Sequence, residues 1–280
     1  MSRHPDIYLS TLKEPKYLSL TANKSPHTGP RDSEVDEAII KTRDDYMALF
    51  QDAGNERIVG EASADYLYFY KIVIPLIKEM SPTAKILILL RNPVDRAFSA
   101  YRHMLKDRRE TLSFEEALDR EPERMNANYE FIWYYKDVGF YEPQVSAYIA
   151  AFGEPNVKVC LQDDLDENPE GVLKDIFRFL GIDENFAPDF DRRLNVSSIP
   201  KSESFESFLT DYEHPVKRIL RPVLLSTIGK DNTESLVNYF KRRNKLVMKP
   251  KTRKLLTETY REDILKLEKL INRDLSGWLR

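Results

Sequence analysis

Arg91 and Ser99 are residues whose types and spacing could hold a phosphate group. A guanidinium can donate two parallel hydrogen bonds to phosphate oxygens, and a hydroxyl can donate a third. Ser99 follows Asn92 by seven residues, a spacing that returns a helical side chain to the side on which the helix begins. The pair therefore indicates an anion site, and a salt-bridged arginine with a solvated serine is the alternative.

The segment around Arg91 predicts a strand that passes directly into a helix. Residues 86–90 are all apolar, the pattern of a strand buried on both faces of a parallel sheet. Asn92 is a good N-cap, Pro93 a good first helical residue, and apolar residues recur at helical spacing from 94 to 105. We therefore expect Arg91 at the carboxyl end of a strand, where open α/β sheets bind ligands and helix N-termini favour anions.

Two carboxylates could act in proton transfer. Glu14 lies between Lys13 and Lys16 and beside a proline, which makes it a candidate general base. A solvated charged loop explains the same residues, and the neighbouring sequence alone favours that alternative. Glu61 opens the segment GEASADYLYFY after an expected short strand, and a cap or a salt bridge within the fold is its favoured role.

Several kinds of site are disfavoured by the residues that the sequence lacks. It contains no GxxxxGK[ST], GxGxxG, HExxH or GxSxG motif, which argues against ATP hydrolysis, dinucleotide redox chemistry and a serine nucleophile elbow. The four histidines are scattered, so a histidine metal site is not expected. Cys160 is the single cysteine and lies in an apolar run, which predicts a buried structural thiol.

Composition predicts one soluble domain. With 280 residues of which 41% are hydrophobic, the chain can bury a full core, and we expect a single domain over residues 1–280. A formal net charge of −3 gives no basic field for nucleic acid or membrane surfaces. No apolar run has the length of a membrane span and the N-terminus has no signal-peptide core, so we expect a cytoplasmic protein.

The order of apolar patterns predicts an α/β protein with a parallel sheet flanked by helices. A polar loop is expected over residues 21–33, and the C-terminal third is expected to be mostly helical, with no convincing strand beyond Asn195. Strands are expected at 57–62, 86–90 and 156–161, and helices at 36–50, 71–80, 94–105, 138–152, 169–180 and 251–270.

Taken together, five segments resemble the sulfotransferase family, particularly its heparan-sulfate-type and bacterial members. The segments are HPDIYLSTLKEPKYL, GEASADYLY, ILILLRNPVDRAFSAY, VGFYEPQVSAYIAAF and DLSGWL, and their order and spacing match over essentially the whole chain. The resemblance implies a P-loop NTPase-like fold and transfer of a sulfuryl group from 3′-phosphoadenosine 5′-phosphosulfate to a hydroxyl or an amine, without a metal. It also implies that Arg91 and Ser99 hold the 3′-phosphate and that Glu14 is the catalytic base.

The resemblance adds weaker site assignments. Glu61 matches an acidic residue of a second family segment, in which Ala62 replaces the usual lysine. Tyr141 falls where the family's helix passes the cofactor or the acceptor, although packing explains it equally well. The supporting site residues implied in this way are Lys13, Glu61, Tyr141, Asn195, Ser197 and Lys201.

The family's phosphosulfate loop, a Lys-x-Gly-Thr-Thr-like turn between its first strand and helix, is absent from this sequence. We expect either a start that lies downstream of the true N-terminus or a degenerate relative, and truncation is the simpler explanation because the remaining segments look intact. A degenerate relative would be a catalytically silent binding protein. The acceptor, a small molecule or a glycan, depends on loops that these motifs do not specify.

Overall fold

The computed structural model describes residues 1, 3–23, 25–186 and 246–280. Its strands are β1 (Ile7–Leu9), β2 (Ile58–Gly60), β3 (Ile86–Leu90) and β4 (Val157–Leu161). β1 pairs with β2 and β3 pairs with β4, both in parallel. The predicted parallel strands with helical crossovers are confirmed, but they form two separate pairs, and β1 was not among the expected strands.

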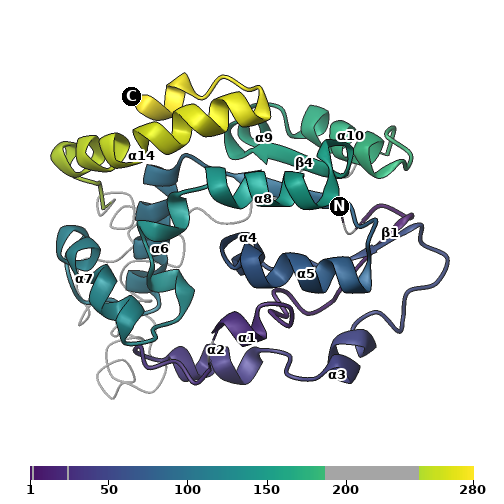
Figure 1. The fold of residues 1–280 in the computed structure, drawn as a ribbon, viewed down its shortest axis with the longest axis horizontal. Helices are drawn as coiled ribbons and strands as arrows, with labels where there is room; N and C mark the ends of the chain where they lie inside the picture. Colours follow the sequence, from purple (N-terminus) through teal and green to yellow (C-terminus); the bar gives the residue numbers. More distant parts are fainter. Residues whose placement is uncertain (2, 24, 187–245) are drawn as a thin grey trace, which may run out of the picture.

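The helices occupy most of the remaining described chain (Figure 1). Short 3₁₀ turns lie between some of them, one of which spans Phe131–Trp133. The α-helices are α1 (Leu20–Asn23), α2 (Asp32–Ala38), α3 (Arg43–Ala48), α4 (Asp65–Tyr68), α5 (Tyr70–Met80), α6 (Pro93–Lys106), α7 (Phe114–Asn126), α8 (Glu142–Phe152), α9 (Gln162–Glu167), α10 (Pro169–Leu180) and α14 (Pro250–Ile271).

Helices with clear start and stop signals match their expected bounds. The expectations for α5, α6, α10 and α14 are confirmed to within one or two residues at most ends. The expected polar loop at 21–33 is interrupted at both ends, because α1 runs into it and α2 begins inside it. Of the C-terminal third, only residues from 246 onward are described, and α14 accounts for most of them.

Two expected helices were wrong in their extent. A single helix over 36–50 is replaced by α2 and α3, because Ile39 is extended and the Thr42 side chain caps a new helix by accepting from the backbone N–H of Asp45. The helix expected at 138–152 begins only at Glu142. Its start is fixed by the Asp263 carboxylate, which accepts hydrogen bonds from the backbone N–H groups of Tyr141 and Glu142.

The main core lies between α14, α8 and α6. α14 runs across α8 and α6 (Figure 1), and Tyr260, Ile264 and Leu267 on it are fully buried. The β1–β2 pair packs instead on a smaller cluster in which Ile7 meets Phe177 of α10. Cys160 is buried in β4, as expected for a structural thiol.

β3 is buried on one face more than on the other. Ile88 and Leu90 are buried in the main core, whereas Leu89 is 51% exposed. The expectation that this strand is buried on both faces is therefore wrong for Leu89. Successive strand residues point to opposite faces, and the described residues leave the face that carries Leu89 partly uncovered.

None of the helices described is long and apolar enough to cross a membrane.

Candidate functional site

The junction after β3 has the expected local structure. The side-chain oxygen of Asn92 accepts hydrogen bonds from the backbone N–H groups of Val94 and Asp95, at 2.9 and 3.4 Å, so it caps α6. Arg91 directly follows β3 and is exposed. No hydrogen bond or ion pair joins its guanidinium to another residue of the described chain, so the salt-bridge alternative is not seen there. Its donors are available to a ligand.

Glu14 lines a recess of about 360 Å³ between the loop after β1, α2, the end of α6 and the segment around Glu130. Lys13 lines the same recess, and so does His103 of α6. Ser99 is half-buried and precedes His103 by four residues, which places the two on the same side of α6 about one turn apart. The recess and Ser99 thus share one side of α6, while Arg91 lies just before that helix begins.

The loop that carries Glu14 has an unusual backbone. Glu14 and Lys16, on either side of Pro15, both adopt left-handed conformations, with φ of 51° and 53°. For residues other than glycine this conformation costs about 1–2 kcal/mol, so the surroundings must hold it in place. Holding contacts are visible: the N–H of Glu14 donates to the carbonyl oxygen of Ala62 at 3.2 Å, and the carbonyl oxygen of Pro15 accepts from Ile40 at 3.1 Å.

Glu61 is connected to this loop by two consecutive hydrogen bonds through Ser63. Its carboxylate accepts hydrogen bonds from the hydroxyls of Tyr46 and Ser63, at 3.3 and 3.0 Å. The Ser63 oxygen in turn accepts the backbone N–H of Lys16 at 3.2 Å. Glu61 is half-buried and does not line the recess. Its contact with the Glu14 loop is indirect, through Ser63.

Lys16 forms a buried ion pair in the lining of the recess. Its ammonium lies 2.7 Å from a carboxylate oxygen of Glu130 and 5.0 Å from the ring centroid of Phe131. Burial alone would lower the pKa of Lys16, but the charge and hydrogen bond of Glu130 outweigh it, and the pKa is raised. Lys16 therefore stays protonated.

The pKa of Glu14 is raised above that of an ordinary glutamate. Glu14 is exposed overall, but the surrounding residues partly desolvate its carboxyl, which is the main cause; the charge of Lys16 opposes this effect, and the charges of Asp65 and Glu130 add to it. A carboxylate with an elevated pKa is a stronger base than a solvated one, because it binds a proton more tightly. Glu14 is thus suited to accept a proton from a group held in the recess.

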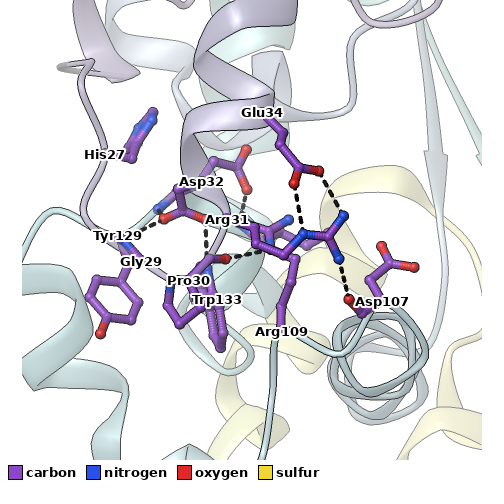
Figure 2. A network of polar contacts seen from close by, with 12 residues as sticks. His27, Gly29, Pro30, Arg31, Asp32, Glu34, Asp107, Arg109, Tyr129 and Trp133 are labelled. Atoms are coloured by element: carbon purple, nitrogen blue, oxygen red, sulfur yellow. Dashed lines mark hydrogen bonds and ion pairs between the residues drawn. The ribbon is translucent and has the colours of Figure 1, made fainter.

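A buried carboxylate, Asp32, organises the rim of the recess (Figure 2). It is fully buried, pairs with Arg109, and accepts hydrogen bonds from the Trp133 indole N–H and from the backbone of Gly29, both at 2.9 Å. Sequence analysis missed Asp32 and Glu130. Their side-chain ion-pair partners lie 77 and 114 residues away, so no local pattern could have shown the contacts.

Tyr141 is the remaining predicted site residue that the structure describes, and it does not line the recess. Tyr141 is buried beside Trp278, with ring centroids 6.5 Å apart, and packs in the core. Asn195, Ser197 and Lys201 lie outside the described residues. In the parts of the chain that are described, no three His, Cys, Asp or Glu side chains are arranged to hold a metal ion, and the expectation of a metal-free site stays a prediction.

Parallel strands with helical crossovers define an α/β protein, and Arg91 follows one of these strands with no partner among the described residues. A family model described as "Sulfotransferase domain" matches residues 70–222. The chain is also similar to a sulfotransferase from Alicyclobacillus acidocaldarius whose crystal structure is known. The two sequences are 37% identical, the structures align with a TM-score of 0.78, and the alignment covers 100% of this chain and 91% of that chain. No curated protein matches the sequence. The chain belongs to the sulfotransferase family, and the predicted fold class is confirmed.

Proposed function

We propose that this sulfotransferase takes its sulfuryl group from 3′-phosphoadenosine 5′-phosphosulfate and that Glu14 is the base that accepts the proton of a hydroxyl or amine acceptor. The observation that carries the proposal is the carboxylate of Glu14, held in the recess by a left-handed backbone with its pKa raised. The acceptor is a small molecule or a glycan, as membership of the family implies.

The residues before and along α6 fit the 3′-phosphate of this donor. Arg91 is exposed at the carboxyl end of β3, and none of the described residues occupies its guanidinium. A planar guanidinium suits bidentate binding of a phosphate, and the N-terminus of a 14-residue helix follows directly. Arg91 and Ser99 would hold the 3′-phosphate. When bound, the donor supplies an electrophilic sulfuryl group and a phosphate that can leave.

Glu14 carries the proton-transfer step in this proposal. An Oε atom of Glu14 takes the proton of the acceptor as the acceptor oxygen or nitrogen becomes nucleophilic, and the proton then passes to water at the open mouth of the recess. Lys16 keeps the carboxylate in its charged form between turnovers, because its ammonium lowers the pKa of Glu14 against the effect of burial. Glu61 stabilises the position of the loop through its hydrogen bond with Ser63, which in turn accepts from the backbone N–H of Lys16.

The phosphate assignment is tested by calorimetry with 3′-phosphoadenosine 5′-phosphate. Arg91→Ala should weaken binding about 10- to 100-fold, the effect of losing a charge-assisted contact. Arg120→Ala is the control, because Arg120 is an exposed arginine on α7 and pairs only with Glu123 among the residues described. Equal affinity in the wild type and in Arg91→Ala would remove Arg91 from the site.

The base assignment is tested by turnover. Glu14→Gln should lower kcat about 10²- to 10⁴-fold, the contribution of a positioned general base, while binding of 3′-phosphoadenosine 5′-phosphate is unchanged. Glu37→Gln removes an exposed carboxylate of α2 that does not line the recess, and should behave as the wild type. Full turnover by Glu14→Gln would assign the base elsewhere.

A further inference from the structure

We infer that the acceptor of this sulfotransferase is an uncharged hydroxyl compound with an apolar portion, and not a polyanionic glycan. The inference rests on the proposed role of Glu14, since it takes the recess around Glu14 as the acceptor site. Three observations carry it: the charges of the described lining balance, three of its four lysines and arginines are already paired within the protein, and part of the lining is apolar.

The formal charges of the described residues that line the recess cancel. Four lysines or arginines and four aspartates or glutamates are among these residues, with one histidine that is formally neutral. An anionic ligand gains binding energy from an excess of unpaired cations, and a cationic ligand gains it from an excess of carboxylates. The described lining offers neither.

Three of the four lysines and arginines in the described lining are also paired. Lys16 pairs with Glu130, and Arg109 pairs with the buried Asp32. The guanidinium of Arg31 donates to both carboxylate oxygens of Glu34, at 2.7 and 2.8 Å, and to a backbone carbonyl oxygen of the α6 end at 2.7 Å (Figure 2).

Lys13, Glu14 and Asp107 are the remaining charged residues of the described lining, and a carboxylate oxygen of Asp107 lies 3.3 Å from Nε2 of His103. Lys13 and Glu14 have no ion-pair partner among the described residues, and their charges are opposite. Lys13 is therefore the one lysine or arginine of the described lining that has no ion-pair partner there and can pair with an anionic ligand. A sulfated or carboxylated glycan needs several such cations.

Part of the lining is apolar, and the recess is small. Val35 and Ala38 lie one turn apart on α2, Ile39 directly follows that helix, and Ile132 joins them from the segment after Glu130. A volume of about 360 Å³ is near the lower end for small-molecule sites. The combination fits a compound of one ring or a short branched chain, whose hydroxyl reaches Glu14 while its apolar part contacts α2.

Three phenols test the inference; they share a two-carbon side chain para to the hydroxyl and differ in whether that chain carries no charge, an ammonium or a carboxylate. 4-Ethylphenol is neutral, tyramine is cationic and 3-(4-hydroxyphenyl)propanoate is anionic, and each carries the same ring and hydroxyl. Their affinities are measured by calorimetry on protein saturated with 3′-phosphoadenosine 5′-phosphate, and their turnover is measured by release of that nucleotide from the donor. We expect kcat/KM and affinity for 4-ethylphenol to exceed those for both charged phenols by about tenfold or more, the scale of one charge-assisted contact.

A variant that removes one negative charge from the lining of the recess provides a second test. Glu34→Gln frees the guanidinium of Arg31 and should improve the affinity for the propanoate relative to 4-ethylphenol by several-fold, in the range of an exposed ion pair. Glu37→Gln changes the net charge equally from the same helix but outside the recess, and should leave the ratio unchanged.

The outcomes separate the inference from the proposed function. A preference for either charged phenol, or binding of none of the three by a protein that still binds 3′-phosphoadenosine 5′-phosphate, would overturn the acceptor class alone. Failure to bind the nucleotide in the absence of any phenol would instead contradict the proposed donor. An unchanged ratio in Glu34→Gln would show that Arg31 does not face the bound acceptor, and would overturn the charge argument.

Discussion

The ammonium of Lys16 lies 2.7 Å from a carboxylate oxygen of Glu130, and these two buried residues line the same recess as Glu14. The two residues are 114 positions apart in the sequence, so they come into contact only in the folded protein. Lys16 thereby brings a fixed positive charge next to Glu14, where it partly offsets the effect of burial on the Glu14 carboxyl. This relationship makes the acid–base behaviour of Glu14 testable.

Lys16→Met should move the acidic limb of the kcat/KM profile to higher pH. The substitution removes the charge that lowers the pKa of Glu14, so the carboxylate takes up its proton at a higher pH and stops acting as a base there. The profile is measured from pH 5 to pH 8. Lys13→Met is the matched control, because Lys13 also lines the recess but is not among the charges that shift the pKa of Glu14.

A buried Glu130 without its partner will also destabilise Lys16→Met, by about 3–5 kcal/mol. The double variant Lys16→Met with Glu130→Gln removes both charges and should recover much of that stability. Because Glu130 raises the pKa of Glu14, the double variant should show a smaller displacement of the acidic limb than Lys16→Met alone. Identical limbs in all of these proteins would contradict the proposed base.

Glu14→Gln should be as stable as the wild type at pH 8, or more stable, despite its loss of turnover. A carboxyl whose pKa is raised on folding stabilises the fold fully only below its unfolded pKa, and this contribution is lost as the pH rises through the folded value. Glutamine does not titrate, so the variant gains on the wild type as the pH rises. Urea unfolding at pH 4 and pH 8 measures the difference, and a gain at pH 4 instead would contradict the sign.

Asp32→Asn should destabilise the protein by about 3–5 kcal/mol, because it leaves the buried guanidinium of Arg109 without its charge partner. For a protein of this size each kcal/mol corresponds to roughly 2–4 °C in Tm. Calorimetric melting checks the value, and Asp119→Asn on the exposed side of α7 serves as the control. A melting temperature within 2 °C of the wild type would show that the rim does not depend on this carboxylate.

Asp263 gives a stability profile with a defined pH window. Burial raises its pKa to about 6, although the N–H groups of Tyr141 and Glu142 act in the opposite direction. Its stabilising contribution is complete below the ordinary aspartate value and is lost as the pH rises through about 6. The free energy of unfolding of Asp263→Asn, relative to the wild type, should therefore rise between pH 4 and pH 7. A difference that is constant over this range would contradict the elevated pKa.

Local signals in the sequence were enough for the elements that flank Arg91. The apolar run of β3, the Asn92 cap and the helical spacing of α6 are all short-range features, and they specify the junction completely. The same holds for α10, which ends at Gly181 in a left-handed conformation. Resemblance to a family then gave Glu14 a role that its neighbours in the sequence disfavoured.

The features of the site that the sequence did not predict depend on contacts between residues far apart in the chain. The left-handed backbone at Glu14 depends on a hydrogen bond to Ala62, and the rim depends on the contact between Asp32 and Arg109. The break between α2 and α3 was missed because the apolar periodicity continues through it, whereas Thr42 starts a new helix. Pairing across the fold, and not propensity, builds the recess.

The two separate strand pairs have a consequence for the behaviour of the protein in solution. β2 and β3 each have one strand partner in the described chain, and they carry two exposed apolar side chains, Val59 at 49% and Leu89 at 51%. Unpaired strand edges with apolar side chains are where one molecule adds to another. Arg57 and Lys85, both exposed, stand immediately before these strands and supply the charges that oppose such contacts. We therefore expect Arg57 and Lys85, which have no part in the proposed chemistry, to limit self-association at high protein concentration.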